Sequence, residues 1–235
     1  MTLLYKHDIL VSSPQSKFRK FLLVFASTLG IAGGWILISE MARPPLIGFP
    51  TDQDYPAAAD QRPRATLAAR LGLVRGDLWA ELFFSFADSI LLRSGRDFSA
   101  ITTLNEAEPA ARRALAYAPY RSEVWLLLAD MAEKYELPNP KSSAALTMSY
   151  YTAPYNLTLT PLRLSAATHG DALRDADLRQ FVERDLRMIF AGKPEQRSAV
   201  VAAYTTASTE GRRLIERIIR EVDPSFLASL PKQIP

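Results

Sequence analysis

The sequence predicts an all-α protein, with a single N-terminal transmembrane helix followed by an α-solenoid domain that ends in a divergent helical cap. Three observations support this fold class. Residues 21–39 form an apolar run without charge, and Ala-Pro-Tyr at 118–120 recurs 35 residues later at 153–155. From about residue 66 onward the apolar spacing is helical and no alternating strand pattern occurs. Helix pairs repeating at about 34 residues are the mark of an α-solenoid.

The first element is the run FLLVFASTLGIAGGWILIS at residues 21–39. At about 1.5 Å per residue, a helix of this length crosses a hydrocarbon core of about 30 Å. Three basic side chains at positions 17–20 precede it, so residues 1–20 are predicted to be a basic cytoplasmic N-terminus. The rest of the chain would then lie in the periplasm of a bacterium, whose inner membrane holds the helix.

Two other interpretations of this run were weighed. A cleaved signal peptide has a similar charge pattern, but the run is long for one and Glu40 stands where a small side chain is needed. A buried soluble helix would show a polar face, and this run has none. An uncleaved anchor is the prediction.

Gly30 and Gly34 form a G-x-x-x-G pair inside the run. Such a pair allows two helices to approach closely, so it predicts contact with another membrane helix, self-association included. Glycine is common in transmembrane helices for other reasons, which leaves the simpler interpretation open.

The net charge of +3 is carried by residues 1–43, which hold five basic and two acidic side chains. The remaining chain is neutral, which argues against binding of nucleic acid. Residues 40–66 are rich in proline and lack helical periodicity, and they are expected to form a semi-extended linker that holds the domain away from the bilayer.

The domain is predicted over residues 67–223, followed by a C-terminal tail at 224–235. Proline and glycine residues separate its helices, among them the Pro138-Asn139-Pro140 cluster. The expected helices lie near 66–73, 77–93, 104–118, 121–136, 140–153, 157–169, 174–191, 195–207 and 209–222.

One set of residues gives the repeat its character. A helix with two small residues ends at a proline, and an aromatic residue, a leucine and a small residue follow at fixed spacing: Ala107, Ala114, Pro119, Trp125, Leu128 and Ala129. This segment resembles the joint between two tetratricopeptide repeats, and Pro154 continues the pattern. The resemblance covers residues 77–169 and implies helix pairs that bind a protein partner on a concave surface.

The chain departs from the family pattern in three places. Trp79 stands at the head of an earlier repeat, but it precedes Trp125 by 46 residues, so RSGRDFSAITTLN at 93–105 is expected to be an insertion or a long loop. The third repeat has Thr160-Pro161 in place of an aromatic residue, and Arg163 and Leu164 interrupt the Leu-small pair. Tyr120 and Tyr155 are expected at equivalent corners, each capping a turn.

Groups that could carry out catalysis are few. The chain has no cysteine, and its two histidines, His7 and His169, are predicted on opposite sides of the membrane. No catalytic triad, Cys-His pair or histidine metal site can therefore form within one domain, and no phosphate-binding glycine motif occurs.

Acidic and basic clusters have structural explanations. Five carboxylates that a glycosidase could use are predicted near helix starts, where helix capping accounts for them: Asp171, Asp175, Asp177, Glu106 and Glu108. Arg174, Arg179, Arg184 and Arg187 alternate with acidic residues, which predicts a salt-bridged face rather than an anion site.

These observations predict a protein that is not an enzyme and needs neither metal nor cofactor. The leading hypothesis is a membrane-anchored scaffold of the bacterial cell envelope whose helical domain binds a protein partner, with polysaccharide assembly or export suggested by analogy. Two alternatives stay open: an accessory subunit that packs into a larger membrane complex through its transmembrane helix, and an envelope enzyme that acts on glycan through two carboxylates.

Overall fold

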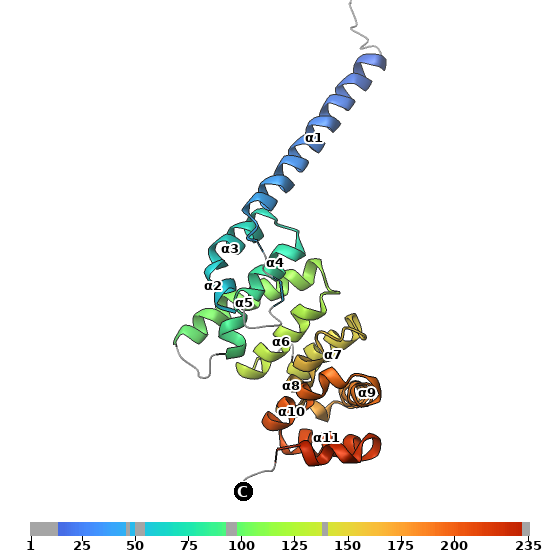
Figure 1. Ribbon diagram of the computed structural model, residues 1–235. Helices are drawn as coiled ribbons and strands as arrows, with labels where there is room; N and C mark the ends of the chain where they lie inside the picture. Colours follow the sequence, from blue (N-terminus) through green and yellow to red (C-terminus); the bar gives the residue numbers. More distant parts are fainter. Residues whose placement is uncertain (1–13, 46–47, 50–54, 93–97, 138–140, 232–235) are drawn as a thin grey trace, which may run out of the picture.

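The computed structural model describes residues 14–45, 48–49, 55–92, 98–137 and 141–231. Throughout these ranges the secondary structure is helical and no strand occurs, which confirms the all-α prediction (Figure 1). The α-helices are α1 (Pro14–Ala42), α2 (Tyr55–Asp60), α3 (Arg62–Leu71), α4 (Gly76–Phe84), α5 (Phe98–Tyr117), α6 (Ser122–Lys134), α7 (Ser142–Thr152), α8 (Thr160–His169), α9 (Ala176–Gly192), α10 (Arg197–Thr206) and α11 (Thr209–Val222). Shorter elements are a π-helix, η1 (Asp88–Leu92), and the 3-10 helices η2 (Ala172–Arg174), η3 (Pro194–Gln196) and η4 (Pro224–Ser229).

Helix α1 extends away from the rest of the molecule as one uninterrupted rod (Figure 1). Its 29 residues span about 43 Å at 1.5 Å per residue. Its apolar side chains are exposed, Ile31 by 73%. Within the described ranges, Gln15–Ala42 is the one helix whose length and composition would allow it to cross a membrane.

The domain is built from helices that pack in pairs. Helix α3 packs against α1 and α4, and the next consecutive pairs are α4 with α5 and α6 with α7. From α8 onward the pairing changes, because α8 packs mainly against α10 and α9 mainly against α11. The change begins at α8, the last helix inside the range 77–169 that resembles tetratricopeptide repeats. The helices follow one another away from α1, and α11 lies at the far end (Figure 1).

Small and branched side chains fill the core between these pairs. The buried face of α5 is made of alanines, including Ala107 and Ala114, which allow neighbouring backbones to approach. Gly76 at the start of α4 shows how closely they approach, since a Cβ atom there would lie 2.8 Å from the Cβ of Ala118. At the other end, α11 buries an apolar stripe of Leu214, Ile215, Ile218 and Ile219.

The prediction of an extended linker at 40–66 is wrong in part. Residues 55–60 and 62–71 form α2 and α3, while 46–47 and 50–54 lie outside the described residues. The prolines mislead because Pro63 occupies the first turn of α3, where a missing N–H costs no hydrogen bond. The described part of this segment lies against the domain instead of separating it from α1, since α3 packs on α1.

Other boundaries also differ from the prediction. The helix expected at 77–93 ends at Phe84 and is followed by η1, and the helix expected at 104–118 begins at Phe98. Residues 98–105 of the predicted insertion at 93–105 are therefore helical, and its residues 93–97 lie outside the described ranges. So do residues 1–13, the Pro138-Asn139-Pro140 break and residues 232–235. The tail predicted at 224–235 begins with η4, which packs on α11.

Candidate functional site

The predicted joint residues lie where two helix pairs meet. Ala107, Ala114, Leu128 and Ala129 are buried, each exposed by 2% or less. Trp125 packs partly buried against the core, and its indole N–H donates to the carbonyl oxygen of Pro119 at 2.8 Å. This hydrogen bond fixes the turn between α5 and α6.

The turn after Pro154 is fixed differently. Thr160 occupies the position that corresponds to Trp125, and a threonine is too short to reach back to the proline carbonyl. The guanidinium of Arg184, from α9, donates to the Pro154 carbonyl at 3.1 Å instead. A distant residue therefore holds the second turn.

Tyr120 and Tyr155 do not cap these turns as expected. They are exposed by 70% and 79%. The Arg184 guanidinium lies 5.8 Å from the ring centroid of Tyr155, and Tyr120 lines a hollow in the surface. The corners thus present aromatic side chains to solvent.

Two hollows meet beside the first turn. One, of about 330 Å³, is lined by Tyr120, Glu123 and Asn156 among others, with Phe49 and Phe84 packed edge to face at 5.5 Å along its side. The other, of about 590 Å³, extends toward the base of α1. Gly48 and Arg121 line both, and the combined depression is called the turn groove below.

Arg121 is the least satisfied polar group of the turn groove. Its Nε atom is buried without a hydrogen-bond partner, and its guanidinium makes no ion pair with any described residue. A guanidinium group that lies in a hollow without an ion-pair partner can bind a carboxylate by donating hydrogen bonds from two of its nitrogen atoms. Tyr120 and Phe49 offer apolar surface next to it.

An ion-pair network forms the end of the turn groove next to α1. The Arg43 guanidinium, just after α1, clasps the carboxylate of Glu81 on α4, with its Nε at 2.9 Å from Oε1 and at 3.0 Å from Oε2. Arg43 also donates to Glu40 at 2.9 Å, and Arg75 joins Glu40 to Asp77 through contacts of 2.6 Å each. Burial raises the pKa of the Glu81 carboxyl, while Arg43 and Arg121 act in the opposite direction.

A second polar cluster, under the second turn, is closed to solvent. Arg163, exposed by 1%, donates to the Ser149 hydroxyl at 3.0 Å and to the Ala153 carbonyl at 2.9 Å, and stacks over the Tyr150 ring. Asp185 is exposed by 2%, and burial raises the pKa of its carboxyl. These groups stabilise the α7–α8 turn from inside.

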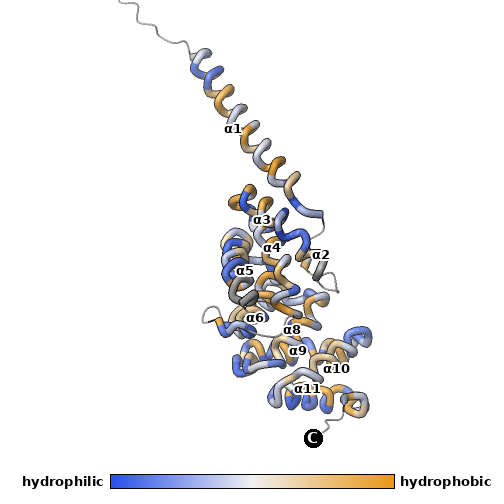
Figure 2. Tube along the Cα trace, turned by 90° about the vertical axis from the view of Figure 1, so that its left-hand side faces the viewer, coloured by the Kyte–Doolittle hydropathy of each residue, from blue (hydrophilic) through white to orange (hydrophobic). Residues whose placement is uncertain are grey.

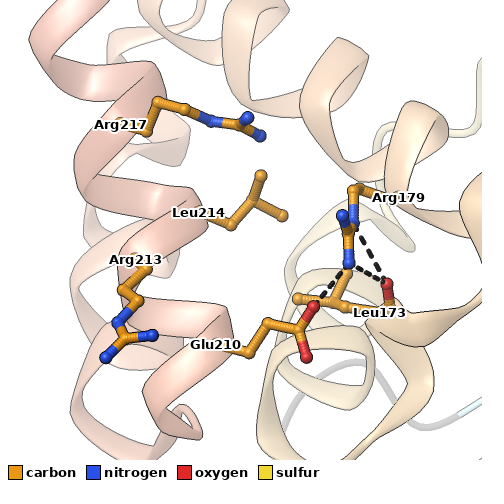
Figure 3. Close-up of a pocket in the computed structure, with 6 residues that line it drawn as sticks. All are labelled: Leu173, Arg179, Glu210, Arg213, Leu214 and Arg217. Carbon is orange, nitrogen blue, oxygen red and sulfur yellow. Dashed lines mark hydrogen bonds and ion pairs between the residues drawn. The ribbon is translucent and has the colours of Figure 1, made fainter.

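Helix α9 carries the salt-bridged face that its sequence predicts. On α9, Arg179 pairs with Glu210, Arg187 pairs with Glu183 and Glu221, and Arg184 lies 3.6 Å from Asp185. Arg174 lies before this helix, in η2, where it pairs with Asp171. A hollow of about 200 Å³ lies between this face and α11 (Figure 3). Arg179 closes one side by bonding to Glu210 and to the Leu173 carbonyl (Figure 3).

The carboxylates considered for glycan chemistry have separate structural roles. Asp175 caps α9 by accepting from the N–H groups of Asp177 and Leu178, as predicted. The capping prediction is wrong for Glu106 and Glu108, because α5 begins at Phe98 and both lie inside it; Glu108 pairs with Arg112 at 2.7 Å.

His169 and the two membrane glycines complete the predicted set. His169 stands at the end of α8, as expected, and its Nδ1 lies 3.0 Å from the Thr206 carbonyl. At Gly30 and Gly34 no atom lies within 4 Å of an added Cβ, so the G-x-x-x-G face of α1 is uncovered.

Sequence reasoning missed Arg121, Glu81 and Arg43, which line the turn groove and its end next to α1. Arg121 directly follows the repeated Ala-Pro-Tyr, and this position was the available signal. No family model, curated protein or solved structure matches this chain.

Proposed function

We propose that this chain is a membrane-anchored protein-binding module. Helix α1 holds it in a bilayer, and the turn groove takes up a segment of a partner protein. The helical domain, with its tetratricopeptide-like pairs α4–α5 and α6–α7, serves as a scaffold of the bacterial envelope, projected to the periplasmic side.

The unpaired Arg121 is the observation that carries this proposal. Arg179, Arg184 and Arg187 on α9 are paired with carboxylates or carbonyls, and Arg121 differs from the other arginines without an ion pair by its place in the turn groove. A ligand carboxylate in the groove would supply the charged partner that Arg121 lacks. The exposed Tyr120 beside it is typical of protein interfaces, where tyrosine is enriched.

The partner segment is therefore expected to carry an acidic side chain next to an apolar one. A photoreactive phenylalanine analogue in place of Tyr120, in cells that make the full chain, should crosslink to a discrete protein. Arg121→Glu should lower the yield of that same adduct at least tenfold, because a carboxylate would then face a carboxylate.

A matched control separates this site from general charge effects. Arg213 on α11 also makes no ion pair with a described residue and lies at the other end of the domain. Arg213→Glu should leave the adduct unchanged. Equal loss in both variants, or no adduct from position 120, would refute the proposal.

The uncovered face of α1 favours a second function, that of an accessory subunit held in a larger complex through Gly30 and Gly34. An unrelated apolar helix in place of residues 21–39 distinguishes the two functions. The adduct at position 120 should persist if the turn groove binds the partner, and should vanish if the membrane helix does.

A further inference from the structure

The turn between α3 and α4 is apolar on its outside. Leu73 and Val74 are exposed by 58% and 67%, and Leu67, six residues before Leu73 on α3, by 53%. In Figure 2 hydrophobic colouring appears on this part of the domain beside the lower end of α1. The patch belongs neither to the core nor to the turn groove.

A hydrogen bond fixes the position of this patch along the axis of α1. The indole N–H of Trp35 donates to the carbonyl oxygen of Leu71 at 2.7 Å. Trp35 lies four residues before Ser39, the end of the charge-free run, which is about 6 Å along the helix axis. Leu71 therefore lies beside the membrane-spanning run and not beyond it.

The backbone of the turn adds a second observation. Leu73 has a φ of 37°, in the left-handed region that glycine occupies without strain. A leucine there costs about 1–2 kcal/mol, and the hydrogen bond that its carbonyl oxygen accepts from the Trp79 indole N–H at 3.0 Å helps to hold it in place. In this conformation the side chain of Leu73 stands more than half exposed on the outside of the turn.

Basic side chains stand next to the apolar ones. Arg64 and Arg70 lie on the exposed side of α3 and form no ion pair with a described residue. Long basic side chains beside an apolar surface are typical of the headgroup region, where the charge meets phosphate while the stem stays in the acyl chains.

We propose that the Leu71–Val74 turn is seated in the same bilayer leaflet that receives the C-terminal end of α1. Leu73 and Val74 enter the acyl-chain boundary, and Arg64 and Arg70 meet anionic headgroups. The bilayer is the occupant because the patch continues the lipid-facing surface of α1. This inference rests on the proposed membrane anchor, and it adds that the domain lies on the bilayer surface.

Single-cysteine labelling tests the seating, because the chain has no cysteine of its own. Full-length Leu73→Cys and Val74→Cys, labelled with the fluorophore NBD, are reconstituted into vesicles of phosphatidylcholine and phosphatidylglycerol whose acyl chains are brominated both near the ester end and near the methyl end. Two further sites serve as references. Ile31→Cys lies in the span, and Tyr155→Cys is exposed on the domain.

Brominated lipid should quench the labels at 73 and 74 at least half as strongly as the label at 31, and the label at 155 not at all. If 31 is quenched while 73 and 74 behave like 155, the seating is wrong and the anchor stands. If 31 is not quenched either, both are wrong. Positions 73 and 74 are labelled in separate variants. If both labels are quenched, the result does not come from damage to the turn by a single substitution.

Discussion

The guanidinium of Arg43 and the carboxylate of Glu81 form an ion pair that joins the end of α1 to α4 across 38 residues of sequence. The side chain of Glu81 is only 7% exposed, whereas that of Arg43 is 35% exposed. The carboxylate therefore depends on the arginine for its charge to be tolerated.

Arg43→Met should lower the free energy of unfolding by about 2 kcal/mol, since it leaves a buried carboxylate without its main partner. The value is below that of a fully buried pair because Arg43 is partly hydrated. Urea unfolding of the full chain in micelles measures it. The double variant Arg43→Met with Glu81→Met should lose less than the two single losses combined, and strict additivity would show that the pair is not coupled.

Arg163→Leu should be the most destabilising of these changes, by about 3 kcal/mol or more, because charged hydrogen bonds to buried carbonyls are lost together. Arg163→Lys should recover little, since an ammonium group lacks the three-nitrogen fork that reaches Ser149 and Ala153. Thermal unfolding monitored by circular dichroism reports both. Arg187→Leu, on the exposed face of α9, should change little; equal effects would contradict the structural role given to Arg163.

Trp125→Phe keeps an aromatic side chain but replaces the indole by a smaller phenyl ring, and so removes the N–H that donates to the Pro119 carbonyl. The expected loss is about 1 kcal/mol. The same substitution at Trp79, whose N–H donates to the Leu73 carbonyl at 3.0 Å, is the natural comparison. A Trp125→Phe protein as stable as the parent would show that the turn does not need this bond.

Asp130 on α6 gives the domain a pH dependence. Burial, and to a lesser degree the nearby Glu133, raises the pKa of its carboxyl to about 7. The folded state then binds its proton more tightly than the unfolded state, so the contribution of Asp130 to stability falls as pH rises from about 4 to about 7. Asp130→Asn should be more stable than the parent at pH 8 and similar near pH 4. A parallel pH profile for both proteins would contradict the assignment.

Gly30→Ile with Gly34→Ile should abolish association between membrane helices, because two branched side chains block the close approach that the uncovered face allows. A two-hybrid assay in membranes measures this. Ile31→Leu, on the same helix, is the control. If the double glycine variant associates as strongly as the parent, the two glycines have no role in contact between helices.

Local signals predicted those parts of the molecule that local chemistry determines. The starts and ends of α6 to α11 lie within a few residues of their predicted positions, because proline, glycine and Asp175 stop or cap helices wherever they occur. The burial of Ala107, Ala114 and Leu128 likewise follows from helical spacing.

Long-range pairs could not be predicted in this way. Nothing near Arg43 in sequence indicates Glu81, and Arg163 looked like an interruption of the repeat rather than a buried anchor. The prolines of 40–66 suggested an extended chain, although a proline in the first turn is compatible with a helix. Arg121 was overlooked because its importance lies in having no partner, which only packing reveals.

The uninterrupted course of α1 from Pro14 to Ala42 has a consequence for orientation. Trp35 and Ser39 face the domain, and at roughly 100° per residue the face of Gly30 and Gly34 is turned by roughly a third of a circle from them. The domain thus cannot rotate about the axis of α1 independently of that helix. A neighbour that packs against the two glycines therefore also determines the direction, about the axis of α1, in which Arg121 faces.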